Sequence, residues 1–270
     1  MVIETPVFKL RQGNSALVIS MPHVGTYLPS WLLARLSIEA KQLMDTDWHL
    51  ELLYDFLEDL DATVLVATHS RYVIDLNRPP NNLSLYPGQN TTSLCPTDSF
   101  DLKPLYLAGC EPSSTEIATR VMNYWQPYHS ALSNELARLK QLHGKVMLWD
   151  AHSIFSKVPR FFSGELAQLN IGTADNQSCG SQLTTALTDI LAGFPKYSFV
   201  VNGRFKGGYI TRHYGNPSQN IHAVQLEIAI RSYMHEALPY TLDAQLSQFL
   251  RPVLRSLLEK MLQRNEATIV

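Results

Sequence analysis

The chain has 270 residues, of which 45% are hydrophobic and 17% charged, a composition typical of a globular protein. Its formal net charge of −2 at pH 7 argues against nucleic acid as a partner, because phosphate binding usually leaves a basic surface. No apolar run approaches the roughly 20 residues that span a membrane, and the first ten residues lack the apolar core of a secretory signal.

Short apolar runs alternate with amphipathic stretches, which is the pattern of strands alternating with helices. In chain order we predict strand Ala16–Met21, helix Ile38–Leu60, strands Ala62–Thr68 and Tyr72–Leu76, helix Ser114–Leu142, strand Lys145–Trp149, helix Ser181–Ala192, strands Tyr197–Val201 and Ala223–Ile230, and helix Leu242–Arg264. Pro127 should kink or break the second helix. Because several strands are apolar on both faces, we predict one α/β domain over residues 1–270, with a mostly parallel mixed sheet flanked by helices on both faces.

Residues 78–112 interrupt this alternation. Six of the chain's 15 prolines fall within them, too many for a regular helix or strand. A loop of this length is usually functional or lies over a binding site. We therefore predict a Pro-rich loop insertion here, within the single domain.

The three cysteines, Cys95, Cys110 and Cys179, are widely separated and form no Cys-x-x-Cys motif. Their number and spacing fit neither a disulfide framework nor a zinc finger. This usage is typical of a reducing compartment, so we expect a cytoplasmic protein.

Reactive side chains fall at or near the carboxyl ends of several predicted strands, where ligands bind in open parallel sheets. These residues are His23, Asn77, Arg78, Asp150 and His152, and Glu227 lies inside the last predicted strand. Two histidines and a carboxylate are the usual protein ligands of catalytic zinc, with water in the fourth position. A histidine taken alone is more often a hydrogen-bonded loop residue than a metal ligand. Asp150 could equally be a capping residue or a histidine partner.

The acidic ligand could be Asp45 or Asp47. An unbroken helix over 38–60 would place Asp45 on its apolar side and Asp47 nearly opposite, which disfavours Asp47 unless a helix begins afresh near Thr46. Both could instead be first-turn acids that complement a helix dipole. The choice between the two stays open at this point.

Glu227 is an acid within a strongly apolar strand, so it should be paired or hydrogen-bonded. It could pair with Arg231, or it could be a general base whose pKa is tuned by burial. A second polar segment, 204–213, contains Gly207 and Gly208, which allow a ligand close to the backbone, and Arg212, which can clamp a carboxylate. The alternative for this segment is a solvated hairpin turn, and that for Arg78 is an ion pair with Asp75.

Seven blocks together resemble the N-formylglutamate amidohydrolase (deformylase) family. They are Pro22–Gly25, Asp45–His49, Ser70–Pro79, Leu94–Thr97, Trp149–Ser153, Asn202–Gly215 and Gln225–Glu227. The resemblance implies a phosphorylase/hydrolase-like α/β fold of the zinc carboxypeptidase and aspartoacylase type. It also implies one Zn²⁺ per chain and hydrolysis of N-formyl-L-glutamate to formate and L-glutamate in bacterial histidine degradation.

The resemblance further assigns roles to individual residues. It implies His23, Asp47 and His152 as metal ligands, although the His-x-x-Glu motif of related zinc hydrolases is broken by Thr26, and Asp45 stays an alternative to Asp47. Glu227 would be the catalytic glutamate. Asn77 and Arg78 would receive a substrate carboxylate, Arg78 would stabilise the oxyanion, and Arg212 and Gly208 would complete the substrate site. One alternative is a related N-acyl-amino-acid amidohydrolase that prefers a different acyl group or amino acid. The other is a non-catalytic protein that binds an anionic metabolite.

Overall fold

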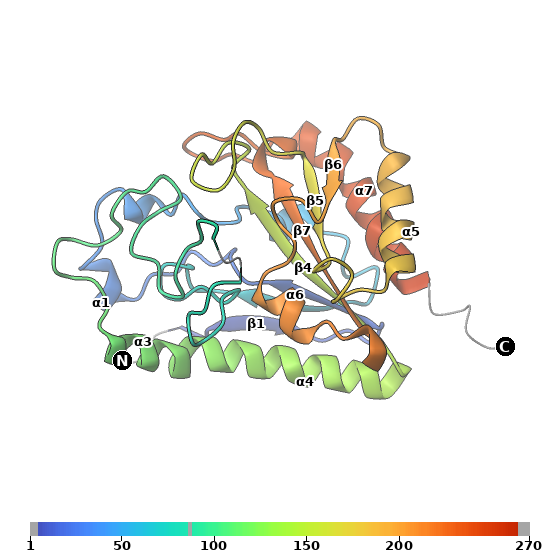
Figure 1. Cartoon of the computed structure of the whole chain (residues 1–270), viewed down its shortest axis with the longest axis horizontal. Coiled ribbons are helices and arrows are strands. Elements are labelled where there is room, and N and C mark those ends of the chain that lie inside the picture. The colour runs from blue at the N-terminus through green and yellow to red at the C-terminus, as the bar shows by residue number, and fades with distance from the viewer. Residues whose placement is uncertain (1–4, 86–87, 264–270) are drawn as a thin grey trace.

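A computed structural model describes residues 5–85 and 88–263 (Figure 1). Its centre is a seven-stranded sheet with the order β1-β3-β2-β4-β7-β5-β6. The strands are β1 Phe8–Arg11, β2 Leu17–Met21, β3 Thr63–Ala67, β4 Val146–Ile154, β5 Leu169–Gly172, β6 Phe199–Val201 and β7 Ile221–Ala229. The pairs along β3-β2-β4-β7 are parallel, as is β5-β6, whereas β1 and β5 run antiparallel to β3 and β7. The predicted mixed, mostly parallel sheet is confirmed.

Helices cover both faces of the sheet, as the doubly apolar strands require. In Figure 1, α4 lies on one side and α5 and α7 on the other. The helices are α1 Ser30–Leu33, α2 Leu50–Leu53, α3 Ser114–Arg120, α4 Gln126–His143, α5 Ser181–Ala192, α6 Tyr209–Tyr214 and α7 Ala244–Gln263. Short 3-10 turns occupy Ala40–Gln42, Pro217–Gln219 and Ile230–Ser232. Alternate residues of β2 enter different cores: Val18 packs in the α4 core, and Ile19 in the α5–α7 core.

The long helix predicted over 114–142 forms as one continuous helical stretch with a change of winding. A π-helical turn, Val121–Trp125, separates α3 from α4, and Pro127 stands in the first turn of α4. A proline is tolerated there because the first N–H groups of an α-helical segment need no intrahelical acceptor. The last predicted helix is present as α7, although its predicted end, Arg264, lies outside the described residues.

Two predicted elements are wrong. Instead of a helix over 38–60 there are only the 3-10 turn at Ala40–Gln42 and the short α2, because Leu43 and His49 adopt left-handed φ angles of 54° and 60°. Segment 72–76, predicted as a strand, is a buried series of turns without sheet pairing. Both errors fall in segments that carry site residues.

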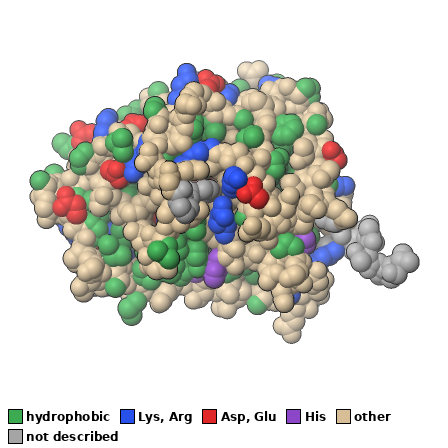
Figure 2. Space-filling view, viewed as in Figure 1, with side chains coloured by type: hydrophobic (Ala, Val, Ile, Leu, Met, Phe, Trp, Pro, Cys, Tyr) green, Lys and Arg blue, Asp and Glu red, His purple; other side chains and the backbone are tan. Residues whose placement is uncertain are grey.

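Residues 78–112 contain no helix or strand at the positions the structure describes, only isolated bridges such as Asp98–Pro104. Within the described part of the chain, no helix is long and apolar enough to cross a membrane. Acidic and basic side chains both appear on the face shown in Figure 2.

Candidate active site

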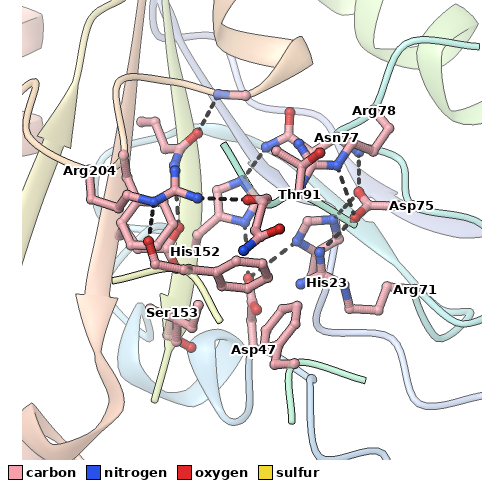
Figure 3. A pocket seen from close by; sticks show the side chains of 18 residues that line it. His23, Asp47, Arg71, Asp75, Asn77, Arg78, Thr91, His152, Ser153 and Arg204 are labelled. Carbon is pink, nitrogen blue, oxygen red and sulfur yellow. Dashed lines mark hydrogen bonds and ion pairs between the residues drawn. The ribbon is translucent and has the colours of Figure 1, made fainter. Parts of the chain in front are cut away.

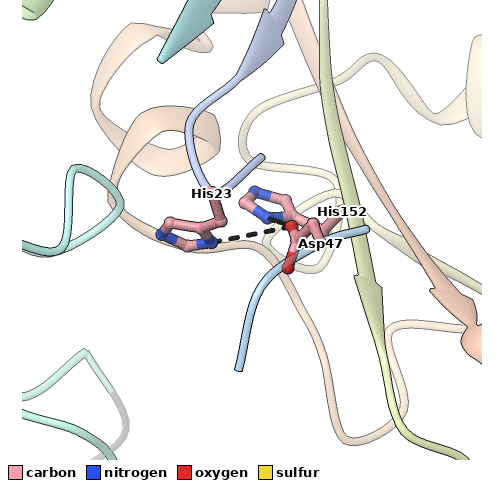
Figure 4. A group of neighbouring side chains, drawn as sticks. All are labelled: His23, Asp47 and His152. Atoms are coloured by element: carbon pink, nitrogen blue, oxygen red, sulfur yellow. Dashed lines mark hydrogen bonds and ion pairs between the residues drawn. The ribbon is translucent and has the colours of Figure 1, made fainter. Parts of the chain in front are cut away.

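Three segments bring His23, Asp47 and His152 together at one edge of the sheet (Figure 4). His23 lies in the turn after β2, and Gly25 permits that turn because a Cβ there would stand 2.6 Å from the backbone nitrogen of His69. The backbone N–H of Asp47 donates to the His23 carbonyl at 3.1 Å. His152 lies inside β4, which runs five residues past its predicted end.

The ligating atoms of these three side chains lie within 4.8 Å of one another, so the group could hold a metal ion. Both histidines direct Nδ1 toward the Oδ2 atom of Asp47, at 3.0 Å for His152 and 3.7 Å for His23. All three residues are at most 4% exposed. Burial of a carboxylate between two imidazoles is costly unless a cation or protons compensate its charge. A buried group of two imidazoles and one carboxylate is therefore suited to hold a metal ion.

Asp45 lies outside this group. Its Oδ2 atom accepts a hydrogen bond from the backbone N–H of Phe100 at 3.0 Å. Burial raises the pKa of Asp45 to about 6. Of the two acidic residues left open by the sequence, the geometry therefore favours Asp47 as the metal ligand and gives Asp45 a structural role.

The second nitrogen of each histidine faces another buried carboxylate. His23 Nε2 lies 2.7 Å from Asp75 Oδ1, and His152 Nε2 lies 3.2 Å from Asp150 Oδ2. Burial alone would raise the pKa of Asp75, but His23 and Arg71 outweigh it and hold this pKa well below its usual value. Such carboxylates fix the tautomer and orientation of metal-binding histidines.

Glu227 is the register partner of His152 on the neighbouring parallel strand β7, so both side chains share one face of the sheet. Burial raises the pKa of Glu227 to about 8. Its Oε2 atom accepts a hydrogen bond from Gln225 at 3.3 Å. Arg231, considered as an ion-pair partner, instead forms an ion pair with Glu165, with 2.8 Å between Nε and Oε1.

A pocket opens over this group, and three arginines line it (Figure 3). They are Arg71, Arg78 and Arg204. The Pro-rich segment 78–112 forms part of the wall through Asn90, Thr91 and Phe100, as expected for a loop over a site. Three lining arginines balance the three lining carboxylates Asp47, Asp75 and Glu227, so a bound divalent cation would make the pocket attractive to anions.

The remaining predicted residues divide into two sets. Asn77, Arg78 and Gly208 line the pocket. Arg78 also approaches Asp75, with 3.9 Å between Nε and Oδ2. The structure does not bring Arg212 to the pocket, because this residue lies on α6 and its Nε atom donates to the Gly207 carbonyl at 2.8 Å. Segment 204–213 is therefore a loop followed by a helix, and not a hairpin.

Sequence reasoning did not single out Arg71, Asp75 and Arg204 as site residues. All three stand inside the two longest matching blocks, 70–79 and 202–215, and that was the available signal. Arg71 donates to Asp75 at 2.6 Å across an i,i+4 spacing, which links one pocket arginine to the His23 partner.

A mixed α/β sheet with a buried His/Asp/His group that could hold a metal ion, a buried glutamate and an arginine-lined pocket is an arrangement typical of metal-dependent hydrolases. A family model described as N-formylglutamate amidohydrolase matches residues 15–234. The chain belongs to this family.

Individual relatives agree with this membership. The chain is 48% identical to the N-formylglutamate deformylase of Pseudomonas aeruginosa, over 95% of this chain and 96% of the relative. It is 46% identical to the N-formylglutamate deformylase of Pseudomonas putida, with the same coverage. The crystal structure of N-formylglutamate amidohydrolase from Ralstonia eutropha JMP134 shares the fold, with a TM-score of 0.79, 22% identity and coverage of 95% and 98%.

Proposed function

We propose that this chain hydrolyses N-formyl-L-glutamate to formate and L-glutamate with one zinc ion per chain, as in bacterial histidine degradation. The observation that carries the proposal is the convergence of His23, Asp47 and His152 beside Glu227, under a pocket lined by arginines. The names of the two Pseudomonas relatives support the substrate. N-formyl-L-glutamate carries two carboxylates, which matches an arginine-rich pocket.

The donor set fits zinc. Two imidazole nitrogens and one carboxylate oxygen leave a fourth position for water or substrate, which is the usual catalytic zinc arrangement. Magnesium and calcium prefer oxygen ligands, so the two histidines argue against them. When bound, zinc would lower the pKa of a bound water and polarise a carbonyl oxygen.

Glu227 is the proposed proton carrier. As a base it takes a proton from the attacking water, and as an acid it passes this proton to the departing amine nitrogen. Its pKa of about 8 in the buried pocket is suited to an acid, and a nearby divalent cation lowers the pKa toward that of a base. One residue can then perform both transfers.

Arg71, Arg78 and Arg204 are the proposed groups for the substrate carboxylates and the oxyanion. Arg71 is 7% exposed, and among the described residues its Nε atom has no hydrogen-bond partner. A buried guanidinium N–H without an acceptor is costly, and a substrate carboxylate would satisfy it. Gly208 forms the adjoining wall, and Arg212 supports that wall through its bond to Gly207.

Steady-state kinetics test the proposal. We expect kcat/KM for N-formyl-L-glutamate to exceed that for N-acetyl-L-glutamate and for N-formyl-L-aspartate by at least an order of magnitude. Chelation should abolish turnover, and zinc should restore it. A large preference for the acetyl compound would indicate a related N-acyl-amino-acid amidohydrolase, and metal-free binding without turnover would indicate a metabolite-binding protein.

We also propose a cytoplasmic location. All three cysteines lie in the described part of the chain and none forms a disulfide, which supports a reducing compartment. Fractionation of the producing cell would test this proposal.

A further inference from the structure

The side chain of Asn77 contacts protein groups through both its amide nitrogen and its amide oxygen. Its Nδ2 atom lies 2.9 Å from His152 Nε2 and donates to Asp150 Oδ2 at 3.2 Å. Its Oδ1 atom accepts the backbone N–H of Ile210 at 2.8 Å. The residue is 6% exposed. These contacts hold the amide between the Asp150 carboxylate and the first turn of α6.

The same contacts surround the outer nitrogen of His152. With Nδ1 directed at Asp47, a metal on Nδ1 requires the imidazole proton to sit on Nε2. With the proton on Nε2, Asn77 Nδ2 cannot donate to this nitrogen, and the acceptor for the proton is Asp150 Oδ2, at 3.2 Å. Asn77 therefore reaches His152 through Asp150, to which it donates. Asp150 is completely buried, and its Oδ1 atom has no hydrogen-bond partner among the described residues, so Asn77 and Thr211 hold this carboxylate through Oδ2 alone.

Gly208 contacts Asn77 from the other side. A Cβ at position 208 would stand 2.5 Å from Asn77 Cγ and 2.6 Å from its Oδ1, which no real structure tolerates. The Gly208 N–H donates to Gln225 Oε1 at 2.7 Å, and the Gln225 amide in turn bonds to Glu227. Gly208 therefore packs against Asn77 on one side and is hydrogen-bonded through Gln225 to the proposed base Glu227 on the other.

We propose that Asn77 is a positioning residue for His152, acting through Asp150, and that Gly208 is a glycine so that the Asn77 amide can occupy this place. The inference rests on the proposed metal site. It replaces the role that the family resemblance implied for Asn77, and it leaves substrate carboxylates to the arginines.

Asn77→Ala and Arg78→Ala test the two roles against each other. We expect Asn77→Ala to weaken zinc binding roughly 10- to 100-fold in a chelator competition and to lower kcat, with KM changed less than about threefold. Arg78→Ala should instead raise KM at least about tenfold and keep zinc affinity within about twofold. Because zinc competition needs no substrate, its result does not depend on the identity of the substrate.

Gly208→Ala provides a second variant that removes no polar group. The added methyl should displace the Asn77 amide and weaken zinc binding in the same direction. Gly193→Ala, at the end of α5 with its nearest contact 3.1 Å away, is the matched control and should leave zinc affinity unchanged. The proposal is overturned if Asn77→Ala raises KM without changing zinc affinity, or if Gly208→Ala binds zinc like the wild type.

Discussion

Four buried aspartates near the pocket show how strongly surroundings decide what a carboxylate does. Asp47 faces both histidines, Asp75 and Asp150 face their outer nitrogens, and Asp45 binds a backbone N–H. Each is at most 5% exposed. Chemistry alone does not distinguish these side chains, so their roles follow from the nitrogen that each one reaches.

Replacement of Glu227 by glutamine should separate metal binding from proton transfer. Glutamine keeps the size and the bond to Gln225 but cannot carry the proton, so we expect near-normal zinc content and a loss of roughly 10²–10⁴ in kcat. Elemental analysis and steady-state kinetics measure both quantities. Glu165→Gln, on an exposed glutamate bonded to Arg231, is the control, and retained turnover in Glu227→Gln would place the base elsewhere.

Asn substitutions at Asp45 and Asp47 should differ in their effect on metal affinity. Asp47→Asn replaces the carboxylate between the two histidines, so we expect zinc affinity to fall by at least about 100-fold. Asp45→Asn should change zinc affinity by less than about fivefold, because Asp45 contacts Phe100 and not the metal group. Isothermal titration with zinc gives both values, and equal affinities would exclude Asp47 as a ligand.

Part of this site could be predicted from residue type and position. His23 and Glu227 stand out because a histidine after a strand and an acid within an apolar strand both need partners. The choice between Asp45 and Asp47 could not be predicted, because it depends on the left-handed turn at Leu43. The contacts of Asn77 could not be predicted either, since only the folded chain brings its amide to Asp150 and to the backbone of Ile210.

At the scale of elements, the central strands and the long helices were predicted, whereas β1, β5 and the short helices were not. The core strands were found because Val18 and Ile19 must each meet a different helical layer, which leaves an apolar run in the sequence. The helix over 38–60 was predicted from an apolar residue at every fourth position. Tertiary contacts override that pattern, and Leu52, which belongs to the predicted stripe, is 55% exposed.

His129 connects α4 to α6 and to the segment that carries Asn77. Its Nε2 atom lies 2.8 Å from the Leu76 carbonyl, and its Nδ1 atom lies 2.9 Å from the Tyr214 hydroxyl. Burial lowers the pKa of His129 to about 3, so the folded protein holds this ring neutral. In the unfolded chain, this imidazole has its ordinary pKa of 6.5 and binds a proton below that pH. The free energy of unfolding that His129 contributes above pH 6.5 is therefore lost as the pH falls from 6.5 toward 3.

The unfolded chain binds one more proton at His129 than the folded chain does, so the free energy of unfolding changes by about 1.4 kcal/mol per pH unit below pH 6.5. Between pH 7 and pH 5, the free energy of unfolding should fall about 2 kcal/mol more in the wild type than in His129→Gln, which cannot titrate. Urea denaturation at the two pH values measures the difference. Equal losses in the two proteins would mean that His129 is protonated in the folded state.

The whole molecule assembles the site from segments that are far apart in the sequence but meet at neighbouring strands of the sheet. His23 follows β2, His152 lies on β4, Glu227 lies on β7, and the Asp47 and Arg204 segments come from loops. Since these segments meet only in the folded chain, zinc binding and folding are thermodynamically linked.

Zinc should therefore stabilise the protein as a whole. At free zinc 1,000-fold above its Kd, binding contributes about 4 kcal/mol, which corresponds to a rise in Tm of roughly 10 °C for a chain of this size. Differential scanning calorimetry in zinc buffers measures the rise, and Asp47→Asn should show much less of it. A Tm independent of free zinc would argue against a site formed by folding.

The central claim is that His23, Asp47 and His152 bind one zinc ion beside Glu227. A crystal structure of the zinc-loaded protein, with anomalous scattering recorded at the zinc edge, tests it most directly. We predict a single strong peak about 2.0–2.2 Å from Nδ1 of both histidines and from a carboxylate oxygen of Asp47. A peak bound by other residues, or a loaded protein with no zinc at these three side chains, would contradict it.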